Sequence, residues 1–450
     1  MSNDRLPPQT KYIVGNEACE RLSYYGVVAI LTTYAAMLFG DVAGATDLAK
    51  DAARQEAKEV VHWWKFATYF LPLAGAFIAD RFWGRYKTIL LISFAYCAGH
   101  GLMSATEGTK WGLFAGLALL AIGSGGIKPC VSAFVGDQFK PGQERQMTTV
   151  YGLFYWSINF GSFFSFAVIP VLKDHFGYAV AFAVPGVFML LATLVFWMGR
   201  KHYVMKPPSA TLTPVDAATK VDDRKTLWSI IAIFAPVTVF WALFDQQHTT
   251  WVQQGNQMLA GSIGSYSVTG ERMQSVNPLY VMTLIPIFTL WLYPALERRG
   301  LKPTPLRRMG VGMVLAAAGF AISAMLQQQI EAGAKLSIWW QLVPYGVMTA
   351  AEVLISTTGL EFAFTVAPAR LKSTIMSFWL LTVAFGNMLA AQVTALNKVK
   401  NAAGETVRRL SASEEMFAYV GLMLVVAGIF AAIARKFPER APQPDPVPQP

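Results

Sequence analysis

The sequence predicts an all-α membrane protein whose twelve transmembrane helices form two groups of six. Of its 450 residues, 54% are hydrophobic and only 14% are charged, whereas about a quarter of the residues in an ordinary soluble domain are charged. The apolar residues fall in blocks of roughly 20 or more, the length that crosses a hydrocarbon core of about 30 Å. The polar, proline-containing stretch 200–226 separates six such blocks from the next six.

Apolar runs bounded by charged residues, glycine and proline give the individual helices. We predict spans over 13–39, 61–79, 87–105, 111–136, 148–172, 178–199, 227–252, 277–296, 308–330, 337–366, 372–397 and 414–435. The polar 41–60 segment predicts a helix outside the membrane. The stretch 200–226 predicts a linker too short for an extra hairpin, and 437–450 a tail.

The basic residues indicate how the helices are oriented. A net charge of +10 could suggest nucleic acid, but the Lys and Arg residues cluster in short connections between apolar blocks. The side that holds the N-terminus carries roughly twice as many of them as the other side, so the positive-inside rule predicts cytoplasmic termini. The cysteines show no disulfide or metal-ligand spacing, and the N-terminus lacks a cleavable-signal pattern, so we expect the first helix to insert uncleaved.

The first block opens with "NEACERLSYYG", which carries three ionisable groups within five positions. Glu17, Glu20, Arg21, Tyr24 and Tyr25 follow helical spacing and share one face. A charge at the bilayer centre costs roughly 2.5–3.5 kcal/mol on insertion scales, so it should face a partner or a water-filled cavity. The face therefore predicts a polar cavity lining, and a self-neutralising cluster that aids packing is the alternative.

The fourth block, "AIGSGGIKPCVS", places Lys128 before Pro129 deep in apolar sequence. Proline kinks a helix, and glycines allow backbones to approach closely. A lysine here requires a carboxylate partner from the protein or from a ligand, and Glu17 or Glu20 is a plausible protein partner. Snorkelling to the surface is the alternative, although it favours helix ends.

The second half of the chain has an acidic centre at Glu352, in "MTAAEVLISTTGLEF". Glu361 lies on the opposite helical face, where a structural pairing role is expected. Cations in the first half and an anion in the second suit a zwitterion, such as a short peptide or a free amino acid, because complementary charges orient a ligand.

Further polar side chains extend this pattern through the apolar blocks. His62 and Tyr69 are seven residues apart on one face, and histidine titrates near neutral pH. A capping or interfacial role is the alternative for His62, and Lys65 is expected to be an interfacial anchor. The other polar side chains within apolar blocks are Asn159, Asp245, Gln246, Gln247, His248 and Asn277.

Four segments of the sequence resemble signatures of the proton-coupled oligopeptide transporter family, also called PTR2. "NEACERLSYYG" is similar to its ExxER-xxYY motif, and "GAFIADRFWGRYKTI" to its loop motif. "FYWSINFGSF" and "AEVLISTTGLEFAFTVAP" resemble its fifth- and tenth-helix segments, in the same order along the chain. The resemblance implies a major facilitator fold: two six-helix bundles around a midplane site, worked by alternating access. The expected limits are 1–199 and 227–436 for the bundles, joined by a cytoplasmic linker over 200–226.

The resemblance also implies a role for each matching residue. Arg21 and Lys128 would bind the peptide carboxylate, and Glu352 would bind the amino terminus. Hydrogen bonds to the peptide backbone would come from Tyr25, Tyr69, Asn159 and Asn277, while Trp241 would line the side-chain pocket. Proton coupling would fall to Glu17, Glu20, His62 and Asp245.

One departure from the family pattern stands out. Many bacterial members carry an arginine just after the tyrosine pair, thought to bridge to the seventh-helix acid, but this chain has Val28 there and keeps the acid as Asp245. Without its usual arginine, Asp245 is expected to take up a proton more readily, because desolvation favours the neutral form.

The function that follows is a proton-coupled symporter importing di- and tripeptides across a bacterial inner membrane. We expect protons as the coupling ion, no cofactor or metal, no nucleic acid partner, and function as a monomer. A family carrier of nitrate or another small solute is the alternative, although Glu352 would repel an anion. A receptor or membrane enzyme is less well supported, because no nucleophile motif or extramembrane catalytic domain is found.

Overall fold

The computed structural model describes residues 6–140, 142–208, 227–359, 362 and 372–436. Most of the predicted linker (209–226), the predicted tail (437–450) and Glu361 lie outside the described residues. The described part is mostly helical, with two short β-hairpins, β1–β2 and β3–β4. The predicted all-α class is therefore confirmed.

The first half of the chain is built from long helices joined by short turns. Its elements are α1 (Thr10–Phe39), α2 (Asp47–Phe70), α3 (Pro72–Ile78), η1 (Ala79–Trp83), α4 (Gly84–Ala105), α5 (Lys110–Asp137), α6 (Glu144–Met198) and η2 (Gly199–Lys201).

The second half is more often interrupted by short helical turns and carries both hairpins. Its elements are α8 (Val237–Phe244), η3 (Asp245–His248), α9 (Thr250–Gly255), β1 (Gly261–Ile263), β2 (Tyr266–Val268), α10 (Gly270–Met273), α11 (Val276–Ile287), η4 (Phe288–Leu292), α12 (Tyr293–Arg298), α13 (Pro305–Glu331), η5 (Ile338–Gln341), α14 (Leu342–Glu352), η6 (Val353–Thr357), α16 (Lys372–Asn397), β3 (Lys398–Lys400), β4 (Thr406–Arg408) and α17 (Ala412–Lys436).

Ten helical stretches of the described chain are long and apolar enough to cross a membrane, and each predicted block overlaps one of them. Two of the ten, Asp47–Ala105 and Thr149–Lys201, each contain two predicted blocks. A straight helix of that length would be roughly 80–90 Å long at 1.5 Å per residue. Both are interrupted at a glycine with positive φ, Gly84 at 72° and Gly177 at 83°, a conformation that residues with a Cβ rarely adopt.

The segment before the second span differs from the prediction. We expected a separate helix outside the membrane, but α2 runs without a break from Asp47 to Phe70. Its start is capped by the Thr46 hydroxyl, which accepts from the Ala49 backbone N–H at 3.2 Å. The sequence 47–70 contains neither glycine nor proline, so nothing in it ends the helix before Pro72 opens α3.

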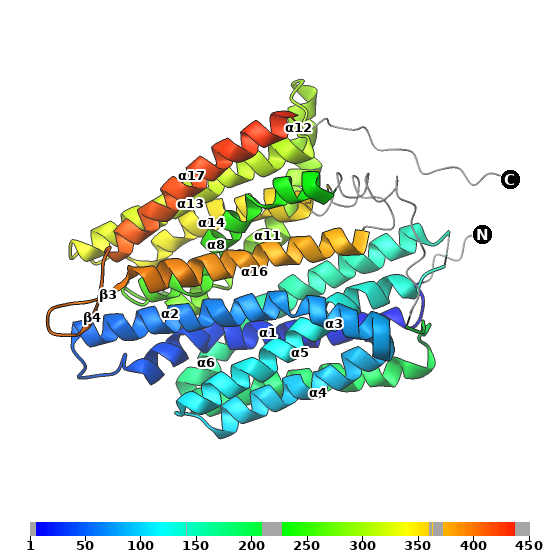
Figure 1. Cartoon of the computed structure of the whole chain (residues 1–450), viewed down its shortest axis with the longest axis horizontal. Helices are drawn as coiled ribbons and strands as arrows, with labels where there is room; N and C mark the ends of the chain where they lie inside the picture. Colours follow the sequence, from blue (N-terminus) through cyan, green and yellow to red (C-terminus); the bar gives the residue numbers. More distant parts are fainter. Residues whose placement is uncertain (1–5, 141, 209–226, 360–361, 363–371, 437–450) are drawn as a thin grey trace.

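The buried apolar side chains form two clusters, one drawn from residues 13–203 and the other from residues 230–430. Figure 1 shows α16 of the second half lying alongside α2 of the first. Within the first half, α3 and α5 touch through glycine: a Cβ on Gly75 would lie 2.6 Å from the Gly126 Cα. Small residues allow such close contact between transmembrane helices. The bundle limits stay a prediction.

The two ends of the helices differ in how the halves meet. In Figure 1, α1 begins and α17 ends at one end of the molecule, while the β3–β4 hairpin lies at the other, here called the hairpin end. Several ion pairs join the two halves toward the hairpin end: Lys58–Glu415, Lys173–Glu271, Arg272–Asp174, Lys398–Glu59 and Arg408–Asp51. The Lys65–Asp245 pair joins the halves further along α2. The halves are therefore held together by charge at the hairpin end.

Candidate functional site

The polar face of α1 forms a compact ion cluster. The Arg21 Nε lies 2.7 Å from a Glu17 carboxylate oxygen and 2.8 Å from a Glu20 carboxylate oxygen. All three residues are buried, with exposed fractions of 8% or less. Two carboxylates therefore share one guanidinium, and if all three groups are ionised this cluster carries one excess negative charge.

Lys128 lies near this cluster but is held differently from what we expected. Its ammonium sits over two aromatic rings, with Nζ 3.9 Å from the Tyr24 ring centroid and 4.2 Å from that of Tyr69. Such cation–π contacts are worth about 0.5–2 kcal/mol. Within the described part of the chain, Nζ is buried without a hydrogen-bond partner.

Two expectations about Lys128 are therefore corrected. Neither Glu17 nor Glu20 forms its ion pair, because both carboxylates are turned onto Arg21 of the same helix. Snorkelling is excluded as well, because the ammonium is buried between rings rather than extended to the surface. The Lys128 ammonium therefore has no direct ion-pair or hydrogen-bond partner among the described residues, although Glu17 and Glu20 act on it electrostatically, and a carboxylate ligand could bind it directly.

The acidic centre of the second half lies at the end of α14. Asn277 donates through its amide to the Glu352 carboxylate at 2.8 Å and to the Thr349 hydroxyl at 3.0 Å. Glu352 is partly exposed and is followed at once by the π-helical turn η6. Turns of this kind are frequent at functional sites in membrane and soluble helices.

Tyr25 links the two charged regions. It interacts electrostatically with Arg21 on its own helix and with Glu352 of the second half. Its ring packs against Tyr24 and Phe166, with centroids 5.1 and 5.5 Å away. The cationic and the acidic regions therefore both lie within electrostatic range of one side chain, Tyr25.

The surroundings of two other predicted ligand residues do not indicate a ligand contact. Asn159 donates to the backbone carbonyl of Tyr155, one turn back on α6, at 3.0 Å. Trp241 is 8% exposed and packs edge-on against Phe244 and Trp379 in the second apolar cluster. Their proposed contacts with a ligand stay predictions.

Asp245 has a cationic partner that the sequence reading missed. The Lys65 ammonium lies 2.5 Å from one Asp245 oxygen, and the Asn387 amide donates to the other at 2.6 Å. Lys65 and Asp245 expose only 3% and 7% of their side chains. The expectation of an acid without a cation is therefore wrong, and so is the interfacial role expected for Lys65.

His62 is a bridge between the two halves. It is fully buried, with one ring nitrogen 2.9 Å from the Asn387 side-chain oxygen and the other 3.1 Å from the Thr249 hydroxyl. A capping or interfacial role is excluded by this burial. His248, for which the sequence indicated no role, contacts the Gln274 amide oxygen at 2.7 Å and stacks on Phe166.

The sequence did contain a signal for these missed contacts. Lys58, His62 and Lys65 are spaced i, i+4 and i+7, which places all three on one face of α2. Each of them contacts a polar side chain of the second half: Lys58 with Glu415, His62 with Asn387, and Lys65 with Asp245. The partners lie far away in the chain, so spacing alone could not identify them.

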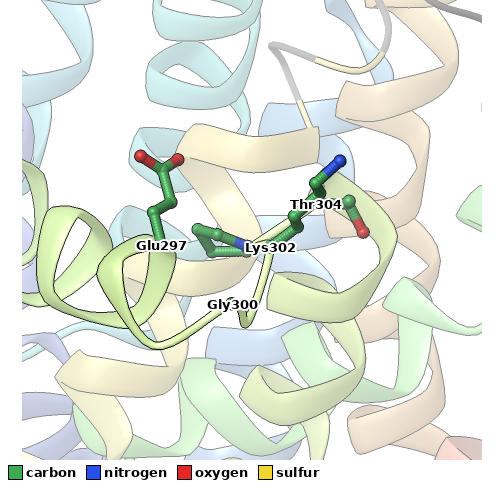
Figure 2. A pocket seen from close by; sticks show the side chains of 5 residues that line it. Glu297, Gly300, Lys302 and Thr304 are labelled. Atoms are coloured by element: carbon green, nitrogen blue, oxygen red, sulfur yellow. The ribbon is translucent and has the colours of Figure 1, made fainter.

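One hollow on the surface of the described chain lies apart from these residues. It has a volume of about 450 Å³ and is lined by the connection between α12 and α13. Figure 2 shows Glu297, Lys302 and Thr304 around the turn at Gly300. This surface hollow contains none of the predicted site residues.

Comparison with known proteins identifies the family. Residues 86–217 and 210–410 match the model of the POT family, PTR2. The chain is 34% identical over 373 residues to "Peptide transporter family 1" of Drosophila melanogaster, which covers 73% of this chain and 48% of that protein. The chain belongs to the POT family. It is also 34% identical over 378 residues to human "Solute carrier family 15 member 1", covering 71% of this chain and 52% of that protein.

Solved structures of POT proteins share the fold. An auto-inhibited POT family peptide transporter superposes with a TM-score of 0.88 at 33% identity, covering 98% of this chain and 99% of that one. The POT family transporter PepTSo gives a TM-score of 0.87 at 35% identity, covering 96% and 98%. The predicted major facilitator fold is therefore confirmed for this POT chain, which spans about half the length of the curated relatives it matches.

Proposed function

We propose that this POT protein is a proton-coupled symporter that imports di- and tripeptides by alternating access. The observation that carries the proposal is the separation of charge between the halves. A buried lysine without a hydrogen-bond partner lies in the first half, and a partly exposed glutamate lies in the second. A zwitterionic peptide matches both, and two relatives are named "Peptide transporter family 1" and "Peptide transporter 3".

The ligand roles follow from that charge pattern. Lys128 and Arg21 bind the peptide carboxylate, and Glu352 binds its amino terminus. The remaining ligand contacts are assigned by family resemblance to Tyr25, Tyr69, Asn159, Asn277 and Trp241. A carboxylate bound to Lys128 makes a charge-assisted hydrogen bond, which is stronger than the contacts with the faces of two rings that it replaces.

Proton coupling is proposed for Glu17, Glu20, His62 and Asp245. Arg21 is held by both Glu17 and Glu20, so protonation of one glutamate leaves the guanidinium with a single carboxylate and makes it more available to the peptide. Asp245 holds Lys65, so protonation there weakens a contact between the halves. The first event changes the affinity of the site for the peptide carboxylate, and the second weakens the contact between the halves. Proton binding and peptide binding are thereby coupled.

The direction of opening is proposed from the ion pairs. Most of those that join the halves lie toward the hairpin end, so the site is closed at that end and opens toward the end that carries the termini. We assign the latter to the cytoplasm, as the positive-inside pattern predicts, in a bacterial inner membrane. The transporter is proposed to act as a monomer, without a cofactor.

The test of the proposal is uptake of labelled dialanine into proteoliposomes. We expect uptake when the outside is acidic, and its loss when a protonophore collapses the gradient. Uptake that ignores the protonophore would contradict symport. Competition by nitrate but not by dipeptides would instead identify an anion carrier.

The role of Glu352 has its own test. Glu352→Gln removes the charge that binds the peptide amine, so dialanine should bind at least about tenfold more weakly, which corresponds to 1.4 kcal/mol. N-acetyl-dialanine, which lacks that amine charge, should bind both forms equally. The matched control is Glu297→Gln, an exposed acid of the same half on α12. Equal dialanine affinity for wild type and Glu352→Gln would contradict the role.

A further inference from the structure

Basic residues of the β3–β4 hairpin form ion pairs with acidic residues in the first half of α2. Arg408 on β4 contacts Asp51 through two nitrogens, with Nε 2.8 and 2.7 Å from the two carboxylate oxygens and Nη2 2.5 Å from one of them. Lys398 on β3 forms an ion pair with Glu59. Figure 1 shows the hairpin beside the beginning of α2. Each strand of the hairpin therefore contributes one cation to one helix of the other half.

A buried ion pair lies beneath this hairpin. The Lys58 ammonium pairs with the Glu415 carboxylate of α17, and the two side chains expose only 2% and 3% of their surface. Asn397, at the base of the hairpin, donates to Glu415 at 2.8 Å and accepts from the Leu410 backbone N–H at 2.7 Å. The same asparagine therefore satisfies the buried carboxylate and closes the hairpin.

The space around this pair is small. A cavity of about 20 Å³ is lined by Lys58, Arg408 and Glu415 together with glutamines of α9 and α13, which is room for about one water molecule. The paired charges can be hydrated fully only if α2 separates from α17. Closing the hairpin end thus removes them from water and opening it returns them, so this pair must be broken when the halves part there.

We propose that the β3–β4 hairpin is a clasp that holds α2 against α17 while the hairpin end is closed, with Lys58–Glu415 as its buried lock. The inference rests on the proposed alternating access, and it names the residues that hold the hairpin end closed. Two kinds of ion pair hold the hairpin end closed. The Arg408–Asp51 and Lys398–Glu59 pairs are partly exposed and weakened by salt, whereas Lys58–Glu415 is shielded from salt by burial.

The experiment measures the distance between the halves directly. Spin labels are placed on cysteines at Ala49 of α2 and Lys335 before η5, which are both near the hairpin end and both exposed. The three natural cysteines are replaced by alanine. The double variant Arg408→Gln, Lys398→Gln should shift part of the distance distribution to longer values, and Lys58→Gln should shift more of it.

Three comparisons decide the result. Exchanging the buried charges, Lys58→Glu with Glu415→Lys, should restore the short distance that Lys58→Gln loses. Asp41→Asn is the matched control, because it breaks the Arg54–Asp41 pair, which lies at the same end but within the first half, and it should leave the distribution unchanged. Added salt should lengthen the distance in the wild type and have little effect once the two hairpin cations are gone.

Distributions that are identical in all variants would overturn the clasp. If Lys58→Gln fails to fold, the double variant Arg408→Gln, Lys398→Gln still tests the clasp, because its two ion pairs are partly exposed. The measurement needs neither peptide nor proton gradient, so it separates two failures: absent dialanine uptake by the wild type refutes the proposed function, whereas unchanged distances in a protein that takes up dialanine refute the clasp alone.

Discussion

The buried Lys65–Asp245 pair, which joins the two halves, makes a quantitative prediction about the free energy of unfolding. Lys65→Met removes the ammonium and leaves Asp245 with the Asn387 amide as its remaining partner among the contacts described. Both side chains are almost completely buried, so the charge left behind cannot be hydrated without opening the interface. Breaking a buried pair from one side costs about 3–5 kcal/mol.

The reverse substitution should cost a similar amount for a different reason. Asp245→Asn still accepts from Asn387 but leaves Lys65 buried without a counter-charge. Combining Lys65→Met with Asp245→Asn removes both charges, so the loss should be smaller than the sum of the single losses. Residues in one contact show interaction energies of about 0.5–3 kcal/mol in such cycles.

The assay is the free energy of unfolding in mixed detergent micelles, followed by tryptophan fluorescence. Lys335→Met is the control, because it removes an exposed lysine near the hairpin end. The reasoning is refuted if both single variants unfold with the free energy of the wild type. It is also refuted if the double variant loses the full sum, since the two charges would then act independently.

Three further predictions concern the packing and the site. Gly75→Ala should destabilise the fold by about 1–3 kcal/mol, because the new Cβ would lie 2.6 Å from Gly126 backbone; unchanged unfolding would show that α3 can shift. Asn387→Leu should cost about 1–3 kcal/mol by leaving His62 and Asp245 each short of a partner, whereas Thr394→Val on the same helix, which loses only a bond to its own backbone, should cost less. Lys128→Met should weaken dialanine binding at least about tenfold and leave the amidated peptide unaffected, a difference that calorimetric titration would detect; equal losses for both peptides would contradict carboxylate binding.

Features set by neighbouring residues could be predicted from the sequence. Helical spacing placed Glu17 and Arg21 on one face of the first helix, and they form an ion pair there. The length of each apolar block identified the spans, because the hydrocarbon thickness fixes how many residues a helix needs. The glycines of the fourth block were expected to allow close approach, and Gly126 touches α3.

Partners from distant parts of the chain could not be predicted in the same way. Lys65 lies 180 positions from Asp245, and no local pattern indicates which acid a buried lysine will meet. The prediction for Asp245 depended on the absence of an arginine at position 28, which is Val28. It did not include the cation that α2 supplies, Lys65. Lys128 shows a second limit: its sequence surroundings indicate that it needs compensation, but not that aromatic rings will provide it.

The position of Lys128 between two rings has a consequence for how fast a ligand can bind. A lysine paired with a carboxylate must exchange one directional partner for another, and the old contact has to stretch before the new one forms. The faces of Tyr24 and Tyr69 attract the ammonium without fixing the direction of its N–H bonds. An arriving carboxylate can therefore bind this lysine after a small turn of the side chain, with no direct ion pair to break among the described contacts.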